Sequence, residues 1–142
     1  MPAGVLDMML TVSIMSNTPA GAYTITLTGT SGSLTHSTSV TLIVNADFSL
    51  SASPTSRTIN HGQSTTYSIT IAALNGFTGS VVLSITGTPA GSSTSFTPNP
   101  AAASSVLTVN TGGGTPSGTY TVTISGTGGG KTHTVTVRLV VN

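Results

Sequence analysis

Apolar and polar residues alternate along most of this 142-residue chain, in short runs that predict β-strands. Between residues 120 and 125, every second residue is Tyr, Val or Ile, and the residues between them are Thr or Ser. A Gly-rich stretch follows at residues 128–130, and a second alternating run ends at Val141. Because successive strand residues point to opposite faces, these runs predict a hairpin with one apolar face and one hydroxyl-rich face.

A similar sequence occurs earlier in the chain. Residues 18–45 align with residues 115–142 at an offset of 97 without a gap, and 15 of the 28 positions are identical. Identical pairs include Pro19 and Pro116, Tyr23 and Tyr120, and His36 and His133. A period of this length has the size of one small domain, so the chain holds about one and a half copies of a repeat.

Residues 46–142 contain the strand patterns of one complete domain. The first run breaks at Pro54 and resumes at Thr58-Ile59, and the runs that follow bring the total to seven strands. Short strands separated by Gly and Pro turns, without a helical period, predict an all-β, immunoglobulin-like seven-stranded sandwich. Its inward residues are expected to be Tyr67, Ile69, Leu83, Ile85, Leu107, Val122, Ile124, Val137 and Leu139.

Residues 1–45 match only the last three strands of that domain. Leu10-Thr11-Val12 aligns with Leu107-Thr108-Val109 at the same offset. Pro2-Ala3-Gly4 resembles Pro89-Ala90-Gly91, with about ten residues missing between that point and Leu10. We therefore expect an incomplete domain at residues 1–45, whose sequence begins inside a repeat, followed by a complete domain at residues 46–142.

The incomplete domain would have an apolar face without a covering sheet. Leaving one such side chain in water forfeits roughly 1.5 to 3 kcal/mol, and a domain of ordinary stability does not tolerate eight of them. This face is predicted to be an interface made by Leu10, Val12, Tyr23, Ile25, Leu27, Val40, Leu42 and Val44.

The number of strands restricts how that interface is covered. Each chain has two copies of the last three strands and one copy of the first four, so exchanging identical pieces among chains leaves one half unmatched. Two solutions remain open. Either residues 1–45 self-associate or pack on the edge strands of a neighbouring subunit, or the missing strands lie upstream of Met1.

Composition limits the partners. Charged residues make up 4% of the chain, Glu and Cys are absent, and about a third of the residues are Ser or Thr. The three cations Arg57, Lys131 and Arg138 cannot neutralise a run of phosphates, which argues against nucleic acid. No apolar run reaches the roughly 18 residues needed for membrane insertion. The hydroxyl-rich, charge-poor surface favours an extracellular or cell-surface location, and its outward Thr rows leave an O-linked glycan open.

Catalytic and metal chemistry lack the residues they need. The candidate bases are His36, His61 and His133, and the side-chain carboxylates are Asp7 and Asp47. A catalytic triad needs a nucleophile, a base and an orienting group within reach, and calcium needs several carboxylate oxygens. We expect no enzyme activity, no cofactor and no catalytic or metal residues, with zinc shared by His residues across chains as a minor alternative. The Gly runs at 112–114 and 128–130 lack the features of a phosphate loop and predict turns.

Seven segments resemble the tandem immunoglobulin-like domains of bacterial secreted and cell-surface proteins. They are Pro54, 59–62 (INHG), 67–69 (YSI), 75–79 (NGFTG), 87–91 (GTPAG), 96–100 (FTPNP) and 116–120 (PSGTY). The resemblance covers residues 46–142 fully and residues 1–45 only in the last three strands. In that family the modules usually act as spacers, stalks or binding accessories beside other domains. Sandwiches of this type place a corner tyrosine where Tyr23 and Tyr120 stand.

Two functional hypotheses follow. The first is a non-catalytic extracellular structural module, a subunit of a fibre, stalk or surface assembly whose N-terminal half-domain is completed by another polypeptide. The alternative is an accessory or carbohydrate-binding module from a larger secreted enzyme or adhesin. Phe77 is the candidate sugar-binding aromatic because it lies in a predicted turn, and its structural alternative is to plug the end of the sandwich.

Overall fold

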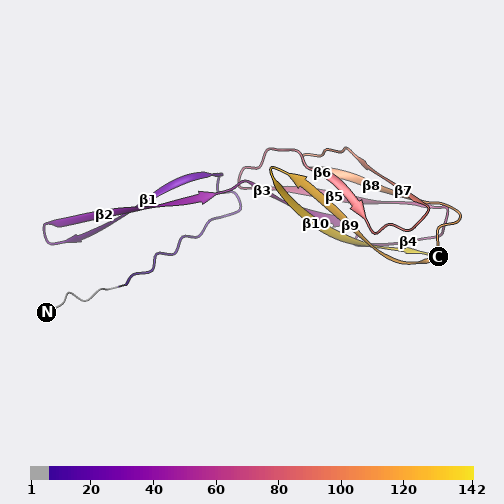
Figure 1. The fold of residues 1–142 in the computed structure, drawn as a ribbon, viewed down its shortest axis with the longest axis horizontal. Coiled ribbons are helices and arrows are strands. Elements are labelled where there is room, and N and C mark those ends of the chain that lie inside the picture. Colours follow the sequence, from indigo (N-terminus) through magenta and orange to yellow (C-terminus); the bar gives the residue numbers. More distant parts are fainter. Residues whose placement is uncertain (1–6) are drawn as a thin grey trace.

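The computed structural model describes residues 7–142, which contain ten β-strands and no helix. Residues 46–142 fold into a sandwich of two four-stranded sheets (Figure 1). One sheet has the order β3 (Asp47–Ser53), β5 (Ser64–Leu74), β8 (Ser104–Thr111) and β7 (Ser92–Thr97). The other has the order β4 (Ser56–Ile59), β10 (Lys131–Val141), β9 (Gly118–Gly128) and β6 (Val82–Thr86). This arrangement is that of immunoglobulin-like sandwiches, so the predicted all-β fold is confirmed.

Pro54 divides the first predicted strand into two strands that belong to different sheets. Strand β3 ends at Ser53 and pairs antiparallel with β5, whereas β4 begins at Ser56 and pairs parallel with β10. Proline has no N–H to donate to a ladder, so the chain leaves the first sheet there. The sandwich therefore contains eight strands rather than the predicted seven, because the sequence pattern predicted a single strand where β3 and β4 form.

The core lies between the two sheets and follows the predicted alternation. Eight of the nine residues expected to point inward are buried, and Ile85 is half-buried against the same core. The alternate residue Thr123 on β9 is only partly covered, and Thr121 is exposed. The strand register inferred from the sequence is therefore confirmed.

Residues 21–44 form a separate two-stranded hairpin, β1 (Gly21–Ser31) and β2 (Leu34–Val44). Its register equals that of β9 and β10 shifted by 97 residues, since Tyr23 lies opposite Leu42 and Tyr120 lies opposite Leu139. Figure 1 shows the hairpin extending away from the sandwich, with the C-terminus at the opposite end of the molecule. The repeated sequence thus encodes the same hairpin twice.

The third strand expected in residues 1–45 does not form. Residues 7–15 lie in no strand, whereas the aligned residues Leu107–Val109 belong to β8, which pairs with β5 and β7. The hairpin has no counterparts of β5 and β7 beside it within residues 7–142, so Leu10–Val12 have no ladder to join. The Pro2-Ala3-Gly4 motif lies outside the described residues.

Candidate interface

The hairpin reproduces the local contacts of its complete copy as well as the backbone. The N–H of Met15 donates to the hydroxyl of Thr18 at 3.0 Å, and the N–H of Gly112 donates to Thr115 at 2.9 Å. Tyr23 and Tyr120 each donate to the carbonyl of the proline four residues earlier, as predicted for a corner tyrosine. The same local hydrogen bonds therefore form in both copies, although only one copy has an opposing sheet.

The face that is buried in the sandwich is largely uncovered on the hairpin. Val137 is 3% exposed, while its counterpart Val40 is 47% exposed. Of the eight residues predicted to form the interface, only Val44 is buried. Three are partly buried (Ile25, Leu27 and Leu42), and four are exposed (Leu10, Val12, Tyr23 and Val40). Val44 is covered because it lies at the base of the hairpin, next to the sandwich. The remaining residues offer an apolar surface for which residues 7–142 supply no sheet.

A glycine shows what covers this face in the complete domain. A Cβ added at Gly126 on β9 would lie 2.8 Å from Leu50 Cδ1 and 2.8 Å from Val81 Cγ1. At the aligned position Gly29 on β1, no atom of the described chain lies within 4 Å of an added Cβ. The two side chains that fill the space over Gly126, Leu50 and Val81, therefore have no counterparts over Gly29 in the described chain.

A hollow of about 360 Å³ occupies that place on the hairpin. It is lined by Met8, Leu27, Thr28, Gly29, His36, Ser37 and Thr38. Met8 is at the rim, because its side chain is almost fully exposed. The hollow is therefore open to an incoming side chain.

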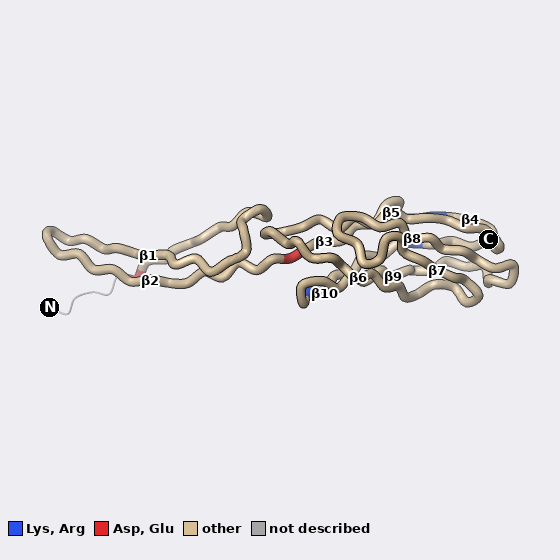
Figure 2. Tube along the Cα trace, turned by 90° about the horizontal axis from the view of Figure 1, so that it is seen from above, with Lys and Arg blue, Asp and Glu red and all other residues tan. Residues whose placement is uncertain are grey.

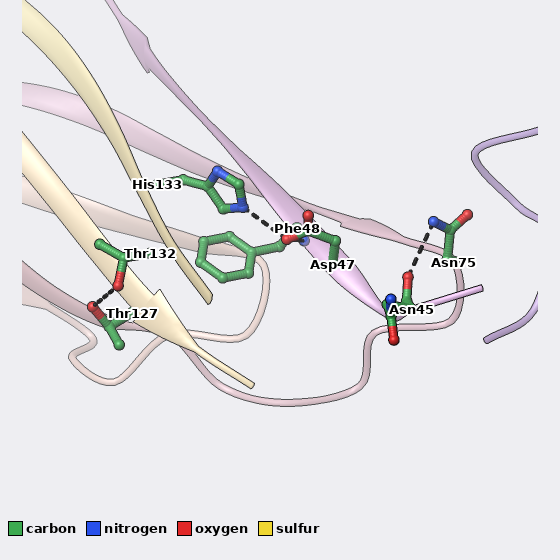
Figure 3. A network of polar contacts seen from close by, with 7 residues as sticks. All are labelled: Asn45, Asp47, Phe48, Asn75, Thr127, Thr132 and His133. Atoms are coloured by element: carbon green, nitrogen blue, oxygen red, sulfur yellow. Dashed lines mark hydrogen bonds and ion pairs between the residues drawn. The ribbon is translucent and has the colours of Figure 1, made fainter. Parts of the chain in front are cut away.

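The corresponding place in the sandwich holds a hydrogen-bonded His–Asp pair and an aromatic contact (Figure 3). His133 Nε2 lies 2.7 Å from Asp47 Oδ1, and the His133 ring stands edge-on to Phe48 with ring centroids 4.8 Å apart. An ionised carboxylate only accepts hydrogen bonds, so Nε2 carries the hydrogen. The bond from His133, with a second from the Phe48 N–H, lowers the pKa of Asp47 below 3.8.

His36 occupies the equivalent position, as the third residue of β2, without these neighbours. No hydrogen bond to its ring is present within the described chain, and the other carboxylate of the sequence, Asp7, makes no ion pair there either. His36 and His133, which are identical in the repeat, therefore have the same backbone position near the start of a strand. The two histidines differ in their hydrogen-bond partner, because Asp47 has no equivalent beside the hairpin.

One turn of the sandwich attaches the base of the hairpin. The N–H of Asn75 donates to the carbonyl of Ser16 at 2.7 Å, and its carbonyl accepts from the N–H of Ala20 at 3.0 Å. Its side-chain amide donates to the carbonyl of Asn45 at 3.2 Å (Figure 3). Asn75 has a φ of 52°, a left-handed conformation that asparagine tolerates better than most residues. The sequence predicted a turn at residues 75–79 but did not indicate that this turn bonds to the base of the hairpin.

The other candidate residues do not gather into a site. His61 lies in the turn after β4, and residues 7–142 contain no group of three His, Cys, Asp or Glu side chains that could hold a metal. Figure 2 shows how few charged residues the chain carries and how widely they are scattered. Phe77 is buried, with its ring 5.2 Å from that of Phe48, so it plugs the sandwich. The run at 128–130 forms the turn between β9 and β10, and no helix in the described part could cross a membrane.

The sequence pattern did not single out Gly29 and His36 as positions where the hairpin lacks the neighbours that Gly126 and His133 have. The signal was present in the repeat, because Gly29 and His36 are identical to Gly126 and His133. Only the structure shows that Leu50 and Asp47 are the residues that contact those two positions in the complete domain.

Comparisons with known proteins give a fold and no family. No protein-family model and no curated protein matches the sequence. A crystal structure of the S-layer protein SbsC superposes with a TM-score of 0.52 at 23% identity, covering 87% of this chain and 16% of that chain. A structure of domains 4 and 5 of SbsC gives a TM-score of 0.49 at 24% identity, covering 75% of this chain and 58% of that chain.

A structure of an endo-fucoidan hydrolase of glycoside hydrolase family 107 gives a TM-score of 0.47 at 13% identity, covering 89% of this chain and 19% of that chain. This chain spans less than two thirds of the length of each of these structures. At such identities the likeness to SbsC shows the fold alone.

Proposed function

We propose that this protein is a non-catalytic structural module of a bacterial extracellular or cell-surface assembly. In this proposal residues 46–142 are a complete immunoglobulin-like domain, and residues 1–45 are the last part of another one that a second polypeptide completes. The observation that carries the proposal is the hairpin β1–β2, which repeats β9–β10 in register but leaves its apolar face open.

The apolar face supports association for a physical reason. Burying apolar surface is the main favourable term in protein association, and isolated two-stranded hairpins are marginally stable in water. Both long edges of the hairpin also lack a neighbouring strand within residues 7–142, whereas β9 and β10 pair with β6 and β4. Almost no charge stands on these strands to repel an incoming strand.

A surface location agrees with the fold comparison and with the composition. The structure with a TM-score of 0.52 belongs to an S-layer protein, and the segments that resemble tandem immunoglobulin-like domains belong to secreted and cell-surface proteins. A polymer such as a fibre, stalk or layer fits a module with one open end. An enzyme does not fit, because the only close pair of ionisable side chains described, His133 and Asp47, stabilises the sandwich.

Sedimentation velocity of two chains tests the proposal. The full chain should associate as its concentration rises, whereas residues 46–142 should fold and stay monomeric. Val40→Asp, on the open face, should reduce association of the full chain, and Ser39→Asp, its neighbour on the opposite face, serves as the matched control. A full chain that remains monomeric at high concentration, with the hairpin ordered, refutes self-association through residues 1–45.

The alternative of a carbohydrate-binding accessory module gains no support from the described aromatic residues. Phe77, its best candidate, is buried, and Tyr120 uses its hydroxyl in the corner turn. Association of the full chain in the same sedimentation experiment would favour the structural module, since an accessory module would be monomeric.

A further inference from the structure

Strands β3 and β4 show what the hairpin lacks. In the sandwich, β3 lies in the sheet opposite β9 and β10, where its Leu50 approaches Gly126 and its Asp47 contacts His133, and β4 pairs with the edge of β10. The N–H groups of Arg138 and Asn142 donate to the carbonyls of Thr55 and Ile59 at 2.8 and 2.9 Å. The matching edge of β2 ends at Val44 and has no strand beside it in the part of the chain that the structure describes.

We propose that the hairpin β1–β2 binds a segment of another polypeptide that resembles residues 46–59 of this chain. The segment carries an acid, an aromatic and an aliphatic residue at the spacing of Asp47, Phe48 and Leu50, and a following strand that pairs parallel with β2. The inference rests on the proposed function and names the partner of the same surface.

The receptor for each of these residues is already in place. The space over Gly29 would take the aliphatic residue, as the space over Gly126 takes Leu50. His36 would receive the acid, as His133 receives Asp47, and the rest of the same hollow, which Gly29 and His36 both line, would receive the aromatic ring. His36 is the one His, Asp, Glu, Lys or Arg side chain of β1 and β2, so one acidic residue of the partner matches the hairpin.

A segment outside residues 7–142 fits this role, because the described strands of the right sequence are already paired. The chain's own β3 is paired with β5, and its own β4 is paired with β10. Donating them to a neighbour would open the donor's sandwich and expose an equivalent face there. This sequence has an extra copy of the last strands of the domain, so a partner that carries an extra copy of its first strands would complete the hairpin. Strands added in this way gain affinity from backbone hydrogen bonds and specificity from every second side chain.

The test uses the full chain and a synthetic peptide of residues 46–59 as the probe. We expect saturable binding, with NMR shifts at His36 and slowed amide exchange at Thr41, the counterpart of Arg138. Gly29→Val should weaken binding about tenfold or more, because its side chain fills the place of Leu50. Thr26→Val, on the opposite face of β1, should bind like the unchanged chain.

A second pair of variants isolates the ionic contact. The Asp47→Asn peptide should bind the unchanged chain more weakly than the natural peptide does, and the two peptides should bind the His36→Gln chain equally. Equal binding of the natural peptide to the Gly29→Val chain, or equal effects of Asp47→Asn with and without His36, overturns the inference. Absence of peptide binding at millimolar concentration, in a full chain that self-associates, overturns it while leaving the proposed function intact. Specific binding in a full chain that stays monomeric supports it and refutes self-association.

Discussion

Tyr23 and Tyr120 make the same hydrogen bond in two copies of one turn. The phenol of Tyr23 donates to the carbonyl of Pro19 at 2.7 Å, and that of Tyr120 donates to Pro116 at 2.8 Å. Tyr120 packs against the core of a sandwich, whereas Tyr23 lies on a hairpin that no second sheet covers. The two residues therefore report on the same interaction with and without tertiary packing.

Tyr120→Phe should destabilise the sandwich by about 0.5 to 1.5 kcal/mol, the net value of a typical hydrogen bond. Tyr23→Phe should leave unfolding of the sandwich unchanged, because its bond lies within the hairpin. Urea denaturation of the two variants checks this difference. An equal loss of stability in both would mean that the hairpin and the sandwich unfold as one unit.

Leu83 tests the core register of the sandwich. It is 3% exposed on β6, so Leu83→Ala should lower the free energy of unfolding by about 2 to 5 kcal/mol. Thr123 points to the other face of β9 and is partly covered, so Thr123→Ala should cost well under about 1 kcal/mol. Similar losses from the two substitutions, measured by thermal or urea unfolding, would contradict the register.

The sandwich was predictable because its strands are local patterns that agree with one another. Alternation placed Ile69, Leu83 and Leu139 inside, and Pro54 marked a break in the first predicted strand. Sheet membership was not predictable in the same way. Nothing in residues 56–59 indicates that β4 pairs with residues of β10 that lie 82 positions later, because that pairing depends on the position of the whole second sheet.

The sequence predicted which residues lie on the apolar face of the hairpin, but it did not predict which contacts that face makes in a complete domain. The repeat identified Val40 and Leu42 as inward residues, because their counterparts alternate in the same way. It also suggested a strand at Leu10–Val12, which needs neighbours that the chain does not place there. The roles of Gly29 and His36 depend on contacts made by Leu50 and Asp47 from a distant strand, and a sequence pattern does not record such contacts.

Gly126 and Gly29 are equivalent positions of the repeat, one packed against side chains and one open. Gly126→Ala should destabilise the sandwich by about 1 to 3 kcal/mol, because the added Cβ would meet Leu50 and Val81 at 2.8 Å. Gly29→Ala should leave the stability of the sandwich unchanged, because an added Cβ there meets nothing within 4 Å. Thermal unfolding of the two variants checks both expectations. A stable Gly126→Ala variant would show that β3 can move away from β9 without cost.

Asp47 links the stability of the sandwich to pH. Its pKa in the folded chain is held below 3.8 by the hydrogen bond from His133 and by the Phe48 N–H. The unfolded chain therefore binds a proton at Asp47 before the folded chain does. The stabilisation is complete above the unfolded pKa, falls as the pH drops below it, and is lost once the pH passes through the folded pKa.

Asp47→Asn should therefore flatten the acid side of the stability curve. The unchanged chain should lose stability steadily as the pH falls from about 5 to below 3.8, and the variant should be less stable at pH 6 but change less over that window. Asp7→Asn, which removes the other side-chain carboxylate from a segment outside the sandwich, is the control and should keep the slope of the unchanged chain. Urea midpoints measured from pH 6 to pH 2.5 supply the comparison. If the three chains lost stability in parallel, the contact between Asp47 and His133 would not be what makes the sandwich sensitive to acid.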